Sequence, residues 1–197
     1  MVESGVIHGR FQIFHLKHME YLLAAKMHCK KLYIGIARPD NTFVASSPLD
    51  IHGTTKRDNP MTYLERVEMI QGALASFGVK REEYEIVPFP INRPEYITQY
   101  VPADAVHYMG VYDAWSEERY QRLLQQKLNV VVLWRKAQED RGIVATDVRT
   151  AIERGDDWQA MVPKSVYEYV ISHGIDQRIR EYAKKGFATG EEVLAKL

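Results

Sequence analysis

The chain has 197 residues, of which 46% are hydrophobic and 26% are charged, a balance that suits one globular domain with a full core and a small appended helical piece. The 26 basic and 26 acidic side chains cancel, and the Lys and Arg residues are scattered, so we expect no nucleic-acid partner. One cysteine, Cys29, excludes an intrachain disulfide, and no apolar run reaches the roughly 18 residues that span a bilayer. Because residues 1–5 also lack the parts of a signal peptide, we expect a cytoplasmic protein with no membrane partner.

The stretch from Ser4 to Met19 predicts a strand, a turn and a helix. Val6 and Ile7 end a buried strand, Gly9 allows a tight exit from it, and helical apolar spacing follows. The turn carries four polar side chains: Arg10, Gln12, His15 and His18. The free N–H groups at a helix N-terminus favour an anion, so the turn is predicted to hold a phosphate.

A second buried strand is predicted over Lys31 to Ala37, and a helix separates it from the first strand. Such a βαβ unit indicates a parallel sheet. Cys29 is predicted to lie on the hydrophobic side of the intervening helix as a small buried thiol. Residues 38–58 show no periodicity and are interpreted as a lid, within which Asp40 is a turn former.

The next helix has two competing start signals. Asn59-Pro60 places a cap before proline at the first helical position, whereas Thr62 and Glu65 form a capping box. Gly78 is placed to end this helix, and on spacing alone Arg66 is a surface residue. The predicted apolar face comprises Leu64, Val67, Ile70, Leu74 and Phe77.

Three further strands are predicted, over residues 84–91, 105–109 and 130–134. In an open parallel sheet, ligands bind outside the carboxyl ends of the strands near the switch point, so the loops at these ends should converge. The loops after the third and fourth strands contain Asn92, Tyr96, Gly110, Tyr112 and Asp113.

A further helix N-terminus is predicted after the last strand. Thr146 is expected to cap this helix and Gly155 to end it. Short helices follow, and the last of them is predicted to begin at Thr189 with Glu192 as its capping box.

Three separated motifs resemble the nucleotidyltransferase superfamily, whose signature is H-x-G-H. Residues 9–18 resemble G-R-F-Q-P-F-H-x-G-H of its nicotinamide-nucleotide adenylyltransferase branch, with Ile13 in place of Pro and Lys17 in place of Gly. Residues 59–66 resemble N-P-x-T-x-x-E-R of the archaeal-type enzymes. Residues 143–149 resemble I-S-x-T-x-I-R, with Val144 in place of Ser. The resemblance extends over roughly residues 4–180.

The resemblance implies an α/β fold with a Rossmann-like, doubly wound, five-stranded parallel sheet in residues 1–155 and a C-terminal helical extension in residues 156–197. It implies that an acceptor phosphate or phosphonate oxygen attacks the α-phosphorus of a nucleoside triphosphate and pyrophosphate leaves. Such chemistry needs in-line positioning and cations that face the developing charge. Mg²⁺ is the expected cofactor, bridging the phosphates without a protein metal site. A homo-oligomer is expected.

Carried over to this chain, the motifs imply three sets of residues. The predicted catalytic residues are His15, Lys17, His18 and Arg149. The predicted nucleotide-binding residues are His8, Gly9, Arg10, Phe11, Gln12, Gly110, Thr146 and Asp147. The predicted acceptor-binding residues are Arg66, Asn92, Tyr96, Tyr112 and Asp113.

The acceptor is inferred from the departures from the family pattern. Relatives that bind a nicotinamide nucleotide place Trp after the third strand and G-N-P after the fourth, where this chain has Tyr96 and Gly110-Val111-Tyr112. Lys17 adds a cation that suits a small, densely anionic acceptor. The local pattern, with F-H-x-x-H, V-P-F-P-I-N and Y-V-P-x-D-A, resembles the branch that transfers CMP to phosphonoformate-type acids. Two alternatives remain: adenylyl transfer from ATP to nicotinamide or nicotinate mononucleotide, and a nucleotide sensor without catalysis.

Overall fold

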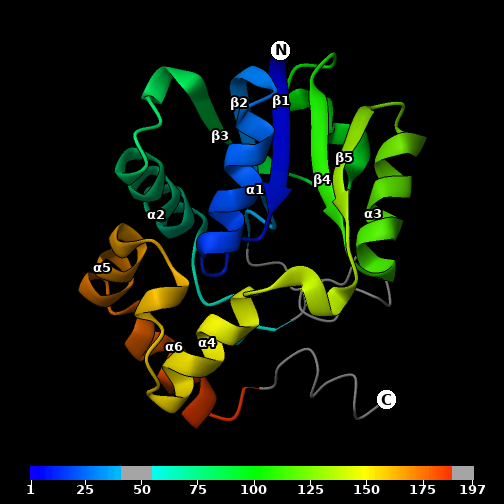
Figure 1. Ribbon diagram of the computed structural model, residues 1–197. Helices are drawn as coiled ribbons and strands as arrows, with labels where there is room; N and C mark the ends of the chain where they lie inside the picture. Colours follow the sequence, from blue (N-terminus) through cyan, green and yellow to red (C-terminus); the bar gives the residue numbers. More distant parts are fainter. Residues whose placement is uncertain (41–54, 188–197) are drawn as a thin grey trace. The chain divides into compact units, whose positions relative to one another are not determined.

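The computed structural model describes residues 1–40 and 55–187, which form two compact units (Figure 1). We call Met1–Arg10, Lys17–Pro39 and Val79–Gly142 the sheet unit, and Phe11–Leu16, Asp40–Gly78 and Ile143–Leu197 the helical unit. The helical unit runs through residue 155, so the expected boundary between 1–155 and 156–197 stays a prediction. Most of the expected lid, and the expected cap at Thr189 and Glu192, lie outside the described residues.

The sheet unit contains the predicted five-stranded parallel sheet, with strand order β3-β2-β1-β4-β5. All neighbouring strands pair in parallel. The chain adds β2 and β3 on one side of β1 and then returns to place β4 and β5 on the other, so the switch point lies between β1 and β4. The bounds are β1 Val2–Gly9, β2 Cys29–Ala37, β3 Tyr84–Phe89, β4 Val106–Val111 and β5 Asn129–Arg135.

Burial on both faces explains why the central strands are almost continuously apolar. Residues 5–8 of β1 are all buried, which is typical of a parallel strand covered on both sides. Helices α1 (Leu16–Lys26) and α3 (Ala114–Gln125) flank the sheet, and α3 contacts β4 and β5 (Figure 1). One core cluster combines Val6, Phe89, Met109 and Leu123 from three strands and α3.

Cys29 is buried as expected, but its predicted place on the first helix is wrong. It is the first residue of β2, and its Sγ donates to the carbonyl of Ala25, 3.6 Å away. Burial raises the pKa of the Cys29 thiol. Helix α1 ends at Lys26, before the cysteine, because the chain must already be extended there to pair with Val2 of β1.

The first long helix of the helical unit is α2 (Tyr63–Ser76). It begins at the capping box of Thr62 and Glu65, the second of the two predicted start signals. Thr62 accepts from the backbone N–H of Glu65, and the Glu65 carboxylate accepts from the N–H of Thr62. Gly78 follows the helix end with a φ of 75°, as expected for a glycine that ends a helix.

The predicted apolar face of α2 is only partly correct. Ile70 and Leu74 are buried, whereas Leu64 and Phe77 are 63% and 47% exposed. The buried stripe is rotated about the helix axis, and its members are Arg66, Met69, Ile70, Ala73 and Leu74. The prediction failed because it excluded an arginine from the buried face.

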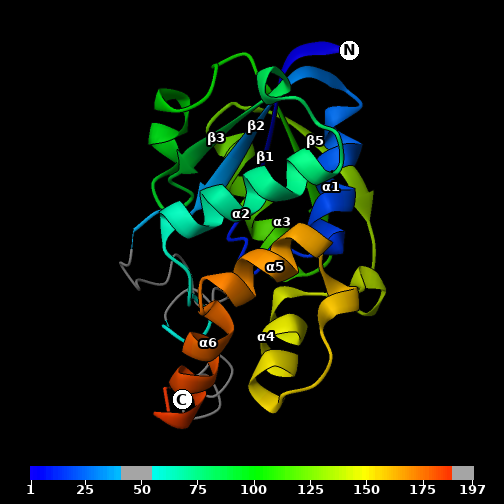
Figure 2. The same ribbon diagram turned by 90° about the vertical axis from the view of Figure 1, so that its left-hand side faces the viewer.

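Three more helices complete the described part of this unit: α4 (Ala145–Arg154), α5 (Lys164–Ser172) and α6 (Ile175–Lys184). Helix α5 packs against α2 and α6, and α4 packs against α6 (Figure 2). Gly155 ends α4 in the left-handed region as predicted. The N-cap of α4, however, is Val144, so the expectation that Thr146 caps this helix is wrong. Within the described residues, no helix is both long and apolar enough to cross a membrane.

Candidate active site

The predicted site residues fall in both units, and each set is described within its own unit. The sheet unit contains His8, Gly9, Arg10, Lys17, His18, Asn92, Tyr96, Gly110, Tyr112 and Asp113. The helical unit contains Phe11, Gln12, His15, Arg66, Thr146, Asp147 and Arg149. In the sheet unit, the carboxyl ends of the parallel strands meet at one edge, which brings the residues that follow β1 and β4 to the switch point.

Lys17 acts through its charge on Tyr112 at this edge. Lys17 lies in the first turn of α1, its side chain is 42% exposed, and its Nζ pairs with Glu20 at 2.5 Å. A Cβ at Gly142 would lie 2.8 Å from Lys17 Cε, so the glycine leaves room for the lysine. Burial raises the pKa of Tyr112, and Glu20 and Lys17 are among the charges that act on this hydroxyl. The lysine that departs from the family signature is therefore paired with Glu20, lies near Gly142, and acts through its charge on Tyr112 in the loop after β4.

Tyr112 is held by residues that the sequence analysis did not select. Trp134 of β5 donates from its Nε1 to the Tyr112 hydroxyl, and the Arg141 guanidinium lies over the Tyr112 ring, 5.2 Å from its centroid. A Cβ at Gly110 would lie 2.4 Å from Trp134 Nε1, so glycine is required there. The only sequence signal for Trp134 and Arg141 is their position: Trp134 is near the end of the last strand, and Arg141 follows that strand.

Asp113 is the N-cap of α3. Its Oδ1 accepts from the N–H of Ser116 at 2.7 Å, and its Oδ2 lies 3.7 Å from Arg141 Nη1. Burial alone would raise the pKa of the Asp113 carboxyl, but the hydrogen bonds from Ser116 and the charge of Arg141 outweigh it and lower the pKa. An acceptor contact by Asp113 stays a prediction, because the described contacts give this carboxylate a capping role.

The other predicted residues of the sheet unit differ in exposure. His8 is 5% exposed and its ring stacks on Phe89, with the ring centroids 4.6 Å apart. Gly9, Arg10 and His18 are half-buried, and Asn92 is exposed. Tyr96 belongs to a 3₁₀ helix, Pro94–Gln99, that follows the third strand where a loop was expected, and its hydroxyl accepts from Arg93.

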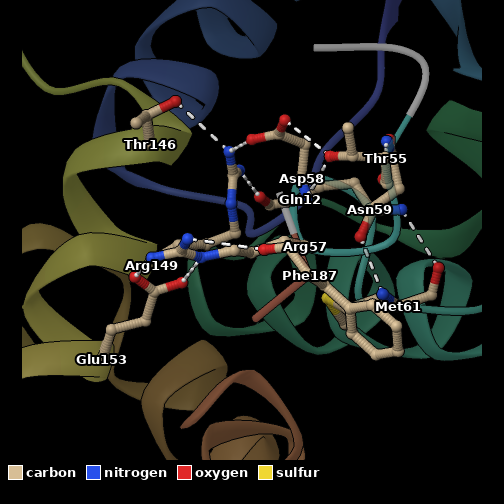
Figure 3. Close-up of polar contacts among 10 residues, drawn as sticks. All are labelled: Gln12, Thr55, Arg57, Asp58, Asn59, Met61, Thr146, Arg149, Glu153 and Phe187. Atoms are coloured by element: carbon tan, nitrogen blue, oxygen red, sulfur yellow. Dashed lines mark hydrogen bonds and ion pairs between the residues drawn. The ribbon is translucent and has the colours of Figure 1, made fainter. Parts of the chain in front are cut away.

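Gln12 of the helical unit is fully engaged by the backbone of Met61. The amide Nε2 donates to the Met61 carbonyl at 3.0 Å, and the Met61 N–H donates to Gln12 Oε1 at 2.8 Å (Figure 3). Nucleotide binding by the Gln12 side chain stays a prediction, since these contacts give it a structural role. This pair of bonds holds the turn after the first strand to the segment that precedes α2.

Arg149 is buried and joins three separate segments of the helical unit (Figure 3). Its Nη2 donates to Asp58 Oδ1 at 2.8 Å and to Thr146 Oγ1 at 3.2 Å, and its Nη1 donates to the carbonyl of Gln12. Burial lowers the pKa of Arg149, and the Asp58 carboxylate opposes that shift. Phosphate binding by Arg149 stays a prediction, since these contacts show the guanidinium holding the turn in place.

Asp58 was missed by the sequence analysis. It is 2% exposed, and its Oδ2 accepts from the hydroxyl of Thr55 at 2.8 Å. The adjacent Arg57 forms two hydrogen bonds with the Glu153 carboxylate of α4, at 2.8 and 2.7 Å. The one local signal was the position of Asp58, directly before the Asn59-Pro60 motif.

The N-terminus of α4 carries two predicted nucleotide-binding residues. The Asp147 carboxylate accepts from the N–H of Val144 at 2.9 Å, which closes the helix end. Thr146 offers its hydroxyl to Arg149, as described above. Val144 brings no side-chain hydroxyl, so backbone N–H groups are the donors that this helix end offers to an anion.

The remaining predicted residues of the helical unit are buried. Phe11, His15 and Arg66 are 1%, 5% and 2% exposed, so the surface position that spacing suggested for Arg66 is wrong. Burial lowers the pKa of Arg66 to about 10, and its Nε donates to the carbonyl of Thr62. Acceptor binding by Arg66 stays a prediction.

The described residues contain no group of three or more His, Cys, Asp or Glu side chains that could hold a metal ion. The expectation that a divalent cation is held by the phosphates of a nucleotide, without a protein metal site, stays a prediction.

The fold and these residues define a class: a Rossmann-like α/β protein with the switch point typical of nucleotide-binding sheets and with Lys17 and His18 in the first turn of α1. A family model described as cytidylyltransferase-like matches residues 6–151. The chain belongs to this family and is a nucleotidyltransferase.

Named relatives cover almost the whole chain. The phosphonoformate cytidylyltransferase of Streptomyces viridochromogenes is 41% identical over 90% of this chain and 95% of its own length. The nicotinamide-nucleotide adenylyltransferase of Saccharolobus solfataricus is 29% identical over 91% and 96%. Among solved structures, a bifunctional NMN adenylyltransferase/ADP ribose pyrophosphatase from Francisella tularensis, complexed with AMP and a manganese ion, superposes with a TM-score of 0.66 at 17% identity. That likeness covers 94% of this chain and 54% of the other, and it supports the fold.

Proposed function

We propose that the protein transfers CMP from CTP to a phosphonate oxygen of a small acid of the phosphonoformate type. The observation that carries this proposal is the 41% identity with a phosphonoformate cytidylyltransferase over 90% of the chain, against 29% for an adenylyltransferase relative of similar coverage. Lys17 supports it from the structure, because an ammonium beside Tyr112 suits an acceptor that is small and densely charged.

The proposed reaction is a single displacement at phosphorus. A phosphonate oxygen forms a bond to the α-phosphorus of CTP, and the bond from that phosphorus to the bridging oxygen of the β-phosphate breaks. Pyrophosphate leaves with the electron pair, and the product is a mixed anhydride of CMP and the phosphonate. No oxidant and no covalent enzyme intermediate are required, so the protein acts by positioning and by charge stabilisation.

The roles we propose follow the family motifs and the contacts. Lys17 and His18, in the first turn of α1, donate to oxygens on which charge accumulates in the transition state. His15 has the same proposed role. Arg149 contributes by holding the turn that contains Gln12, and through this turn it orients the phosphate-binding N–H groups.

We propose Mg²⁺ as part of the nucleotide substrate. When bound with the nucleotide, Mg²⁺ would lower the negative charge that the acceptor must approach. The bifunctional Francisella tularensis protein was crystallised with AMP and a manganese ion, and the present chain covers 54% of it. Location in the cytoplasm, a homo-oligomeric state and the helical extension at 156–197 stay predictions.

A substrate matrix tests the proposal. Purified protein with Mg²⁺ and pyrophosphatase is given CTP or ATP together with phosphonoformate or nicotinamide mononucleotide, and phosphate release and product mass are measured. We expect turnover with CTP and phosphonoformate. Turnover of ATP and the mononucleotide, with none from CTP, would instead establish the adenylyltransferase alternative that the Saccharolobus solfataricus relative supports.

The departures at Lys17 and Val144 support one other candidate, a nucleotide sensor that binds without reacting. Thermal stabilisation by CTP or ATP, with no pyrophosphate release for any acceptor in the matrix, would favour this sensor.

A further inference from the structure

Two histidines lie on the same face of the sheet, at its switch point. His8 is on β1 and His107 is on the neighbouring β4, where it pairs in register with Val6. Side chains alternate along a strand, so Val6, His8 and His107 all point to one face. Phe89 of β3 packs on that face as well, stacked on His8 and tilted against His107 at a centroid distance of 6.2 Å.

Both imidazoles are buried without a hydrogen-bond partner among the described residues. His8 is 5% exposed and His107 is 1% exposed. Neither ring nitrogen of either histidine forms a hydrogen bond with another described residue. Because buried polar atoms are almost always paired in native proteins, two such rings side by side call for a bound group that supplies the missing partners. Packing alone would be served better by apolar side chains of similar size.

A cation completes the cluster. Arg119 of α3 lies near enough for its charge to lower the pKa of His8, after the larger effect of burial, and His107 acts in the same direction. The Arg119 guanidinium lies 4.0 Å from the centroid of the Trp115 ring. Its charge also reaches Tyr21 of α1, whose hydroxyl donates to the Tyr108 carbonyl of β4. The site therefore combines two N–H donors from neutral rings with one fixed positive charge.

Charge effects on two tyrosines connect this cluster with Lys17. Burial raises the pKa of the Tyr21 hydroxyl, Arg119 acts to lower this pKa, and Tyr112 acts to raise it. The charge of Lys17 in turn acts to lower the pKa of Tyr112, which burial raises. His8 lies one residue before the carboxyl end of β1, and His107, the second residue of β4, is paired with Val6, two residues earlier in β1.

We propose that His8, His107 and Arg119 bind the carboxylate of a small phosphonate acceptor and so select acids that carry a carboxylate beside the phosphonate. The inference rests on the proposed function and extends it. Neutral imidazole donates a hydrogen bond to a carboxylate without requiring a second buried charge, and arginine matches the planar carboxylate with two parallel N–H groups. Held by its carboxylate, the acceptor would leave its phosphonate oxygens to face the nucleotide.

The test compares the KM values for two acceptors in proteins that carry single substitutions in α3. The acceptors are phosphonoformate and methylphosphonate, which lacks the carboxylate. The variants are Arg119→Gln and Arg119→Lys, with Arg122→Gln as the matched control, because Arg122 lies one turn further along α3 and pairs with Glu118. Circular dichroism and thermal unfolding establish that each variant is folded. His107→Gln is a second test of the same site from the sheet.

We expect Arg119→Gln to raise the KM for phosphonoformate at least tenfold and to leave the KM for CTP within about twofold. Arg119→Lys should recover part of the loss, and Arg122→Gln should behave as the unchanged protein. With methylphosphonate, Arg119→Gln and the unchanged protein should be equally poor. If His107→Gln does not fold, the Arg119 variants alone decide the matter.

The inference is overturned if Arg119→Gln leaves the KM for phosphonoformate unchanged, or weakens both acceptors equally. The two rings would then be satisfied by water alone. Failure of the proposed function is separate: the unchanged protein would release no pyrophosphate from CTP with either acceptor. In that case, calorimetric binding of phosphonoformate to the unchanged protein and to Arg119→Gln still decides the inference, since no difference, or no binding at all, refutes it.

Discussion

Arg149 donates a hydrogen bond from Nη2 to Oδ1 of Asp58 at 2.8 Å, and both side chains are almost fully buried. The two residues are 91 positions apart in the chain. Because Nη1 of the same guanidinium donates to the Gln12 carbonyl, the ion pair couples the signature turn to the segment before α2. The stability of the turn should therefore depend on a carboxylate that is outside every signature motif.

Asp58→Asn keeps the shape of the side chain and removes its charge. The Arg149 cation then remains buried without its counterion, so we expect a loss of about 3–5 kcal/mol in the free energy of unfolding. Urea denaturation measures the loss. Lys164→Gln, which breaks an exposed pair with Glu168 in α5, is the control and should cause no measurable change. An equally small change in Asp58→Asn would contradict the role assigned to the buried pair.

Gln12→Met removes both hydrogen bonds to the Met61 backbone while keeping a side chain of similar length. Two buried backbone groups, the N–H and the carbonyl of Met61, lose their partners. We expect each unsatisfied group to lower the free energy of unfolding by at most about 1–3 kcal/mol. Gln12→Glu keeps the acceptor but places a buried carboxylate oxygen against the Met61 carbonyl oxygen, so at neutral pH it should be at least as destabilising as Gln12→Met. Chemical denaturation of the three proteins at one pH gives the order.

Lys17→Ala tests charge stabilisation in the transition state. If the ammonium acts mainly there, kcat should fall roughly 10²- to 10³-fold while the KM for CTP changes little. Lys30→Ala is the control, because Lys30 pairs with Glu3 on an exposed part of the sheet unit. A parallel loss of CTP affinity, measured by calorimetry without acceptor, would show instead that Lys17 binds ground-state phosphate. We expect the same division between kcat and affinity for His18→Ala.

The acid stability of the protein should depend on His107. Burial lowers the pKa of His107 from 6.5 to about 4, so between these values the unfolded chain binds a proton that the folded protein does not. Stability contributed by the neutral ring is complete above pH 6.5 and falls as the pH drops toward 4, by roughly 3 kcal/mol.

Urea denaturation from pH 7.5 to pH 4 measures this slope. His107→Gln should be less stable at neutral pH but should lose less stability on acidification than the unchanged protein. His173→Gln, at an exposed position, should keep the slope of the unchanged protein. Identical slopes for His107→Gln and the unchanged protein would contradict the prediction.

Local patterns predicted a large part of the fold. The five parallel strands, the capping box of Thr62 and Glu65, and the helix ends at Gly78 and Gly155 all follow from residues close in the chain. A strand that is buried on both faces, such as β1, has a nearly continuous apolar sequence. A helix end with a positive φ favours glycine, which a local pattern can show. The motif at residues 9–18 pointed to the nucleotidyltransferase class for the same reason, since a phosphate-binding turn is a local structure.

Other features were decided by partners far away in the sequence. Gln12 reaches Met61 across 49 positions, and Arg149 reaches Gln12 across 137. Arg66 is buried although its spacing resembles that of a surface arginine, and Cys29 was assigned to a helix although it pairs as a strand. No local pattern records such pairings, because each depends on the position that another segment takes in the folded unit.

The sequence by itself determined the class of protein, the parallel sheet and the turn that follows its first strand, because these depend on periodicity, caps and contiguous motifs. Only the tertiary structure decided which polar side chains hold that turn and which remain for ligands. It showed Asp58 and Arg149 neutralising each other in a buried pair, and it placed His8 beside His107 at the switch point. Hydrogen bonds and charges are satisfied in three dimensions, so the duties of a polar residue follow from its neighbours in the fold.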